Sequence, residues 1–136
     1  MLLKTLTNSV KNWRAPRGDK HKWGPMPEVI FPGPEGRLEG RYHPQKIKDA
    51  PIAIILHPHP QFGGTMNNRV VYNLHYAFFN MGFTVLRFNF RGVGRSQGEY
   101  DQGIGELSDA ASASSEGNRH KSASADGSSR FAKITA

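Results

Sequence analysis

Short apolar runs, separated by loops rich in glycine and proline, dominate the middle of the chain. Apolar residues at 29–31, a proline and glycine cluster at 32–36 and a partly alternating run at 37–42 predict a β-hairpin. The run 52–56 is wholly apolar and largely β-branched, which is typical of a strand that is buried on both faces of a parallel sheet. We therefore expect the folded part to begin with a hairpin and a buried strand.

A helix and a second buried strand are predicted next. Apolar residues at helical spacing favour a helix over residues 68–80, and Gly82 is the type of residue that often ends a helix in a left-handed conformation. The β-branched and aromatic run 83–90 predicts another strand, and a further helix is expected to begin at Glu106. Strand, helix and strand in this order form a βαβ unit. The pattern therefore predicts an α/β fold with a mainly parallel sheet.

The two ends of the chain differ from this central part. Residues 1–26 include a basic amphipathic stretch and are predicted to be a flexible extension, with a surface-binding or organelle-import segment as the alternative. Residues 27–113 hold the pattern of a single partial domain. Residues 114–136 are rich in small, polar and basic side chains, so we expect a low-complexity, disordered tail.

The net charge of +7 is unevenly distributed along the chain. Residues 1–24 hold six basic and one acidic side chain, residues 25–113 hold eight of each, and residues 114–136 hold four basic and two acidic side chains. The patterned part is therefore neutral, whereas a nucleic-acid-binding domain needs a basic face interleaved with aromatic side chains. We expect no nucleic-acid partner.

The chain has no cysteine, and it has no long apolar run. Without cysteine there are no disulfides, thiolate nucleophiles or Cys-ligated metal sites, and a reducing cytoplasm is the simplest location. The longest apolar run, 52–56, is far shorter than the roughly 20 residues of a membrane-spanning helix. The sequence therefore predicts a cytoplasmic protein without a transmembrane segment.

Candidate chemistry lies in residues 57–60, a His-Pro-His-Pro segment that follows the first buried strand. Backbone N–H groups in such a loop can stabilise the oxyanion of a tetrahedral intermediate. Proline has no N–H, so only His59, Gln61 or a later residue could donate. A purely structural loop and a metal site are the alternatives, but no neighbouring Asp, Glu or Cys completes a ligand set. We expect no metal.

Ser96 lies in a segment, residues 94–98, that matches Gly-x-Ser-x-Gly literally. A nucleophilic serine of this type lies at the end of a strand and opens a helix. Ser96 instead lies six residues beyond Phe90, and the glycines that follow disfavour an immediate helix. Ser96 is therefore expected not to be a nucleophile.

The glycine-rich loop 91–105 offers little other chemistry. It lacks the third glycine of a dinucleotide-binding turn and the Gly-Lys-Ser/Thr of a phosphate-binding loop, so no cofactor is expected. Arg87, Arg91 and Asp109 could form a buried polar cluster, and a salt bridge that braces this loop is the preferred interpretation.

The two loops together resemble those of the α/β-hydrolase superfamily, in its small bacterial branch with a Leu-His-Pro-His-Pro loop and an Asn-Phe-Arg-Gly-Val-Gly-Arg-Ser loop. Residues 56–60 and 89–96 carry these motifs, and the similarity runs from about residue 27 to residue 113. The resemblance implies the N-terminal part of an α/β-hydrolase fold. It also implies that the first loop is an oxyanion loop with His59 as its favoured donor, and that the second loop is structural.

The resemblance further implies a serine esterase or peptidase that acts on small ester or amide substrates. In that family the catalytic serine lies on the strand after the next helix, with the acid and the histidine later still. Here the sequence changes character at Ser114 and no such elbow follows, so we expect a truncation or frameshift and a chain without its catalytic triad. The alternative is a non-catalytic fragment, or a small interaction module that pairs through its open sheet edge, including with a second copy.

Overall fold

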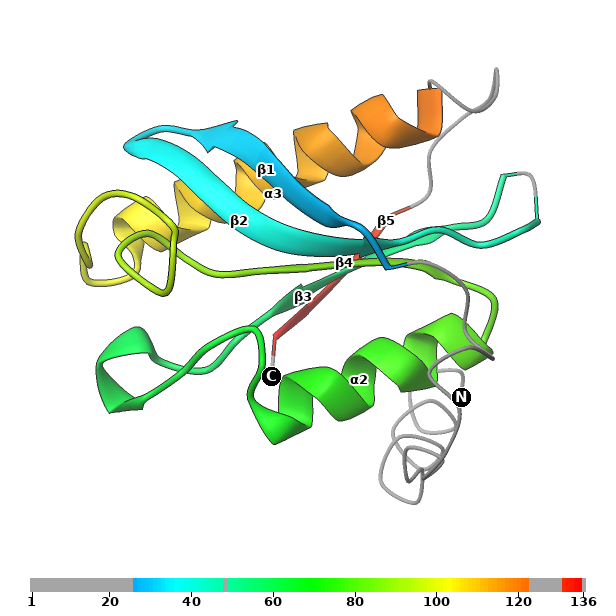
Figure 1. The fold of residues 1–136 in the computed structure, drawn as a ribbon, viewed down its shortest axis with the longest axis horizontal. Coiled ribbons are helices and arrows are strands. Elements are labelled where there is room, and N and C mark those ends of the chain that lie inside the picture. The colour runs from blue at the N-terminus through cyan, green and yellow to red at the C-terminus, as the bar shows by residue number, and fades with distance from the viewer. Residues whose placement is uncertain (1–25, 48, 123–130, 136) are drawn as a thin grey trace.

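The computed structural model describes residues 26–47, 49–122 and 131–135, and it contains a five-stranded sheet with one helix on each face (Figure 1). The strands are β1 (Glu28–Gly33), β2 (Gly36–His43), β3 (Ile52–Leu56), β4 (Thr84–Phe88) and β5 (Phe131–Thr135). The helices are α2 (Arg69–Asn80) and α3 (Ile104–Ser122), and a short 3-10 helix, η2, spans Pro60–Phe62. Neither α2 nor α3 has an apolar stretch that could cross a membrane. The α/β prediction is confirmed, whereas the predicted extension, 1–26, lies outside the described residues except for Met26.

The sheet is mixed, with the strand order β1-β2-β4-β3-β5. β1 and β2 form the predicted hairpin, in which Gly33 pairs with Gly36. The φ of +122° at Gly36 shows why a glycine ends this turn. β2 is antiparallel to β4, whereas β3 is parallel to both β4 and β5. The parallel part of the sheet is therefore β4-β3-β5, and the hairpin extends it on one side.

Helix α2 begins and ends where the sequence predicts. The Asn68 side chain accepts a hydrogen bond from the Val70 N–H at 2.9 Å and caps the helix, and Gly82 follows its end with a φ of +93°. The buried face of α2 packs on the β3 and β4 side chains of the same sheet face. The members of this cluster are Ala53, Ile55, Val71, Leu74, Phe78 and Val85.

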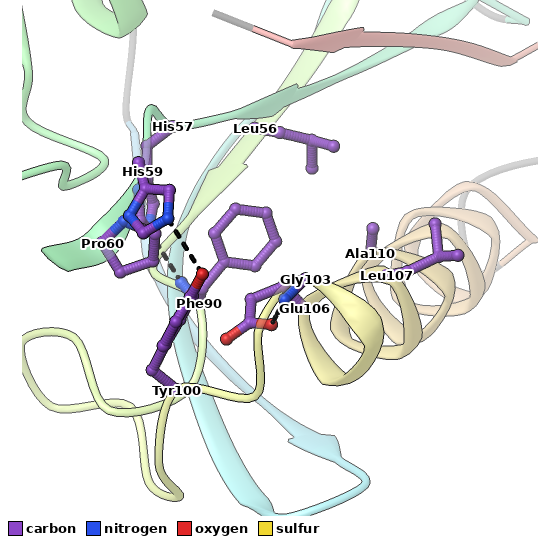
Figure 2. A pocket seen from close by; sticks show the side chains of 10 residues that line it. All are labelled: Leu56, His57, His59, Pro60, Phe90, Tyr100, Gly103, Glu106, Leu107 and Ala110. Carbon is purple, nitrogen blue, oxygen red and sulfur yellow. Dashed lines mark hydrogen bonds between the residues drawn. The ribbon is translucent and has the colours of Figure 1, made fainter.

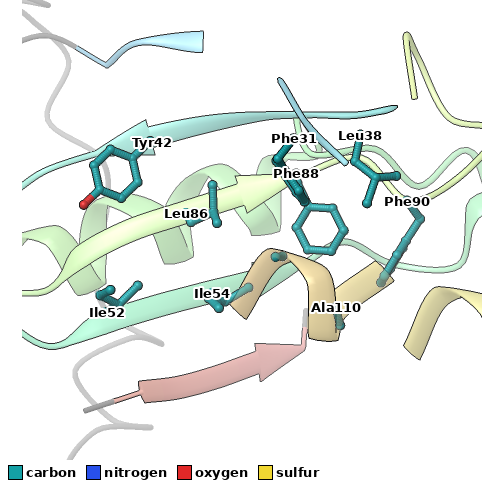
Figure 3. Close-up of a cluster of buried hydrophobic side chains, with 10 residues drawn as sticks. Phe31, Leu38, Tyr42, Ile52, Ile54, Leu86, Phe88, Phe90 and Ala110 are labelled. Carbon is teal, nitrogen blue, oxygen red and sulfur yellow. The ribbon is translucent and has the colours of Figure 1, made fainter. Parts of the chain in front are cut away.

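The opposite face of the sheet carries the larger apolar cluster, which α3 covers (Figure 3). Phe31 of β1 meets Phe88 of β4 edge to face, with ring centroids 5.8 Å apart. From the helix, Ala110 and Ala113 pack against this cluster. Because these side chains are small, α3 can lie close to the sheet without a stripe of large apolar residues.

Helix α3 continues past residue 113 to Ser122, into the segment that was expected to be disordered. The ring of His120 stacks on Tyr42 of β2 with centroids 4.7 Å apart, and Glu116 is buried and accepts hydrogen bonds within the helix. Residues 131–135 pair in parallel with β3. The structure therefore has a helix over 114–122 and a strand over 131–135, where the composition predicts a disordered tail. Residues 123–130 and 136 lie outside the described part.

Two histidines are fully buried between β2 and α2. The Nδ1 atom of His43 lies 2.9 Å from the Nε2 atom of His75, and both residues are 0% exposed. Burial, with smaller contributions from the charges of Arg87 and His43, lowers the pKa of His75 to about 2. The folded protein therefore holds His75 in its neutral form at any moderate pH.

We expect acid to destabilise the fold through His75. Its pKa is lower when folded than when unfolded, where it is near 6.5, so the unfolded chain binds the extra proton as the pH falls. Below pH 6.5 the free energy of unfolding should fall by up to about 1.4 kcal/mol per pH unit. Urea unfolding at pH 7 and pH 5 measures this loss, and His75→Phe should reduce it, whereas a control change at the exposed His59, His59→Ala, should not. A stability that is equal at both pH values would contradict the assignment.

Candidate functional site

A cavity of about 260 Å³ lies where β3 and β4 end (Figure 2). Three segments form its walls: the loop after β3, the loop after β4 and the first turns of α3. Its apolar lining consists of Leu56, Pro60, Phe90, Leu107 and Ala110. Ligands of open α/β sheets bind outside the carboxyl ends of the strands, so this cavity has the expected position for a functional site.

His57 closes the base of the first loop and has a structural role. Its Nε2 atom accepts a hydrogen bond from the Phe90 N–H at 3.0 Å, so the proton resides on Nδ1, which donates to the carbonyl oxygen of Pro58 at 2.7 Å. Burial lowers the pKa of His57, although its bond to Pro58 acts in the opposite direction. A neutral His57 thus ties the end of β3 to the end of β4, and neither of its ring nitrogens is available for a ligand.

The two predicted oxyanion donors, His59 and Gln61, differ in the structure. The Gln61 N–H donates to the Nδ1 atom of His59 at 3.2 Å and is therefore occupied. The Nε2 atom of His59 lies 2.9 Å from the hydroxyl of Tyr100, so the two loops meet at this ring (Figure 2). Among the hydrogen bonds between described residues, none uses the backbone N–H of His59. Of the two predicted donors, His59 is the one with a free N–H.

Ser96 does not line the cavity but is buried in the glycine loop, 6% exposed. Its Oγ atom donates to the carbonyl oxygen of Asn89 at 2.7 Å and accepts from the Glu39 N–H at 3.0 Å. The side chains of Glu39 and Asn89 are themselves joined at 2.7 Å. A side chain at Gly94, where φ is +57°, would collide with both of them. Ser96 therefore takes part in a buried network that holds this loop against β2.

The predicted polar cluster forms in part. Arg91 binds Asp109 through its guanidinium at 2.9 Å and through its backbone N–H at 3.0 Å, and its guanidinium also donates to the carbonyl oxygen of Gly105. Arg87 does not join this cluster, which corrects the prediction. It shares the α2 face of β4 with Val85, because side chains alternate along a strand, and its guanidinium lies 5.2 Å from the centre of the Tyr72 ring.

Glu106 and Tyr100 are the cavity residues that sequence reasoning missed. Glu106 is 5% exposed, and its carboxylate accepts hydrogen bonds from the N–H groups of Asp101 at 3.0 Å and Gly103 at 2.8 Å. Burial acts to raise the pKa of Glu106, but these two N–H groups, its own backbone N–H and the charge of Arg91 outweigh it, so the pKa is lowered. A glutamate three residues after Gly103, at the start of a helix, is the capping signal that could have identified this role.

Metal binding finds no support in the part of the chain that the structure describes. No group of three or more His, Asp or Glu side chains there gathers closely enough to hold an ion. The ring nitrogens of His57 and His59 are occupied by the contacts given above.

Comparison with known proteins gives several similarities. No family model matches the chain. An uncharacterized protein of Rickettsia prowazekii (strain Madrid E) is 57% identical over 88 residues, which are 65% of this chain and 37% of the relative. A solved structure of a protein of unknown function from Agrobacterium tumefaciens, a candidate α/β hydrolase, is 65% identical with a TM-score of 0.71, over 79% of this chain and 48% of that one.

Two further solved structures are described as an α/β serine hydrolase homologue and as a member of the α/β serine hydrolases. A serine hydrolase homologue from Coxiella burnetii is 39% identical with a TM-score of 0.72, over 80% of this chain and 50% of that one. A serine hydrolase without a lid from Xanthomonas campestris is 32% identical with a TM-score of 0.62, over 79% of this chain and 48% of that one. The chain thus spans about half the length of these structures and less than half of the curated relative. With the order of its strands and helices, these similarities show that the chain carries the N-terminal part of an α/β-hydrolase fold.

Proposed function

We propose that this chain supplies the oxyanion-stabilising part of a serine-hydrolase active site for small ester or amide substrates. The observation that carries the proposal is the free backbone N–H of His59, on a loop that lines the cavity at the ends of β3 and β4. Pro58 and Pro60 have no N–H, and the N–H of Gln61 is bound to the ring of His59. His59 is therefore the residue of this segment that can donate to a developing oxyanion.

The surroundings of His59 favour this role. Its ring is held on one side by the Gln61 N–H and on the other by Tyr100, and its carbonyl oxygen accepts from the N–H groups of Phe62 and Gly64. A donor that is already positioned needs no reorganisation when the charge develops, and a largely apolar cavity strengthens its interaction with that charge. In an intact hydrolase a second donor is the N–H after the nucleophilic serine.

The serines whose contacts the structure describes are poor candidates for the nucleophile. Ser96 is buried and bonded to two backbone groups. On α3, Ser108, Ser112, Ser114 and Ser115 each donate to the carbonyl oxygen four residues earlier. Without an adjacent base, a serine hydroxyl is a weak nucleophile. We therefore assign to the chain the oxyanion-stabilising part of the active site and not the nucleophile.

The purified chain should show no turnover of p-nitrophenyl acetate beyond the rate in buffer. The physical reason is the lack of an activated nucleophile. An oxyanion donor stabilises the tetrahedral intermediate, and this intermediate forms only after a nucleophile has attacked the ester carbonyl. The Ser96→Ala variant should behave identically. Turnover that a fluorophosphonate serine reagent abolishes would contradict this proposal, and its loss in Ser96→Ala would identify that serine as the nucleophile.

A second candidate function is that of a small interaction module, and the free edge of β5 favours it. β5 pairs with β3 on one side, and no other strand of the described part pairs with its second side. The unpaired backbone groups of such an edge can pair with a strand of another chain, including a second copy. Sedimentation velocity over a range of concentrations tests this function: a dimer is expected, and a monomer at every concentration would exclude self-pairing.

A further inference from the structure

The cavity holds hydrogen-bonding capacity that the protein itself does not use. The Glu106 carboxylate accepts the backbone N–H groups of Asp101 and Gly103 and interacts with its own N–H, and a carboxylate with about four acceptor positions can still accept one more hydrogen bond. Tyr100 lies opposite, with its hydroxyl 2.9 Å from His59 (Figure 2). Because Gln61 donates to Nδ1 of His59, the neutral ring carries its proton on Nε2 and donates to Tyr100. Tyr100 keeps its hydroxyl proton and a lone pair, whereas Glu106 is the acidic residue among those that line the cavity.

Glu106 forms no direct ion pair with a described residue, although the charge of Arg91 acts on it. None of the ion pairs in the described part of the chain includes it. The nearby Arg91 is committed to Asp109 and to the carbonyl oxygen of Gly105. Glu106 is 5% exposed and lines an otherwise largely apolar cavity. A charge in this position interacts more strongly with a cation than it would in water.

From this geometry we infer that the cavity binds a small apolar group that carries an ammonium, with the ammonium on Glu106. The ring of Phe90 and the side chains of Leu56, Leu107 and Ala110 would surround the apolar part. A volume of about 260 Å³ limits this part to a single ring or a short chain. If the ligand is the substrate, the inference rests on the proposed function, and the ester or amide would carry an amine-bearing apolar group. Binding of the ammonium itself does not depend on the proposed function.

Two matched small molecules test the inference on the full-length, unaltered chain. Benzylammonium and benzyl alcohol have nearly the same size and ring, but only the first carries a charge. Each is titrated into the ¹⁵N-labelled protein at pH 7, and the backbone amide shifts of Leu107 and Ala110 report occupation of the cavity. We expect benzylammonium to bind roughly tenfold more tightly than benzyl alcohol, because a charge-assisted hydrogen bond is the stronger one.

The Glu106→Gln variant and its control separate charge from shape. Glu106→Gln should weaken benzylammonium roughly tenfold and leave benzyl alcohol unchanged, since the amide keeps the size but loses the charge. Glu99→Gln, at an exposed position that does not line the cavity, should change neither. Equal affinity of the two probes for the unaltered chain would overturn the inference even if Glu106→Gln did not fold. Amide shift changes that map to residues outside the cavity would also overturn the inference. Hydrolysis plays no part in these titrations, so failure of the proposed function would leave their result intact.

Discussion

Replacing His59 by proline is expected to reduce ester hydrolysis by roughly 100- to 1,000-fold in an enzyme that contains this loop together with a complete triad. The loss is that of one oxyanion donor, because proline has no N–H. The backbone at residue 59, with φ −46° and ψ 121°, is close to what proline adopts, so the change removes the donor without forcing the loop into a new shape.

The measurement needs a host that supplies the rest of the fold. The Agrobacterium tumefaciens protein is 65% identical and about twice as long as the matched region, so a chimera with residues 27–113 of this chain is a suitable host. Labelling by a fluorophosphonate reports that the nucleophile is present, and hydrolysis of p-nitrophenyl acetate gives kcat/KM.

His59→Ala is the matched control for His59→Pro. Alanine removes the same ring, with its bonds to Gln61 and Tyr100, but keeps the N–H. We expect it to retain activity within about tenfold of the unaltered chimera, so that most of the loss is specific to proline. If alanine and proline reduced kcat/KM equally, the side chain rather than the N–H would be the important group. Full activity of His59→Pro would exclude His59 as the donor.

Asp109→Asn is expected to lower the free energy of unfolding of this chain by about 3 to 5 kcal/mol. Asp109 is 0% exposed and bonds both the guanidinium and the backbone N–H of Arg91, which is itself 5% exposed. Removing the negative charge leaves the buried arginine without its hydrogen-bonded counter-charge, which costs more than the pair contributes when intact. Urea unfolding at pH 7, followed by circular dichroism, measures the change.

Two comparisons show whether the buried charge is the cause. Glu99→Gln removes an exposed carboxylate and should alter the stability by less than about 0.5 kcal/mol. The double change Arg91→Met with Asp109→Asn removes both charges and should recover part of the loss, because no unpaired cation remains. A loss below about 1 kcal/mol for Asp109→Asn alone would mean that Arg91 finds water or another partner.

Local signals in the sequence determined the elements that surround the site. The proline and glycine turn predicted the β1–β2 hairpin, Asn68 and Gly82 bound α2, and the β-branched run at 52–56 became β3 in the parallel part of the sheet. These features depend on backbone geometry, capping and periodicity, which act over a few residues.

The sequence also narrowed the candidate chemistry at two positions. Proline's missing N–H limited the donors of the His-Pro-His-Pro segment to His59 and Gln61 or later residues. The distance of Ser96 from Phe90 argued against an elbow serine, and its buried bonds to Glu39 and Asn89 agree with a structural role. Both conclusions rest on covalent structure and chain distance, which need no knowledge of packing.

Only the tertiary structure decided which of these groups meet and which are already occupied. The ring of His59 takes up the N–H of Gln61, Arg91 rather than Arg87 pairs with Asp109, and Glu106 lines a cavity built from three separate segments. Helix α3 likewise packs against the sheet through the small side chains of Ala110 and Ala113, although these leave no apolar period in the sequence. In each case the deciding contact joins residues from different elements, and no local pattern records such a contact before the sheet and its helices have packed.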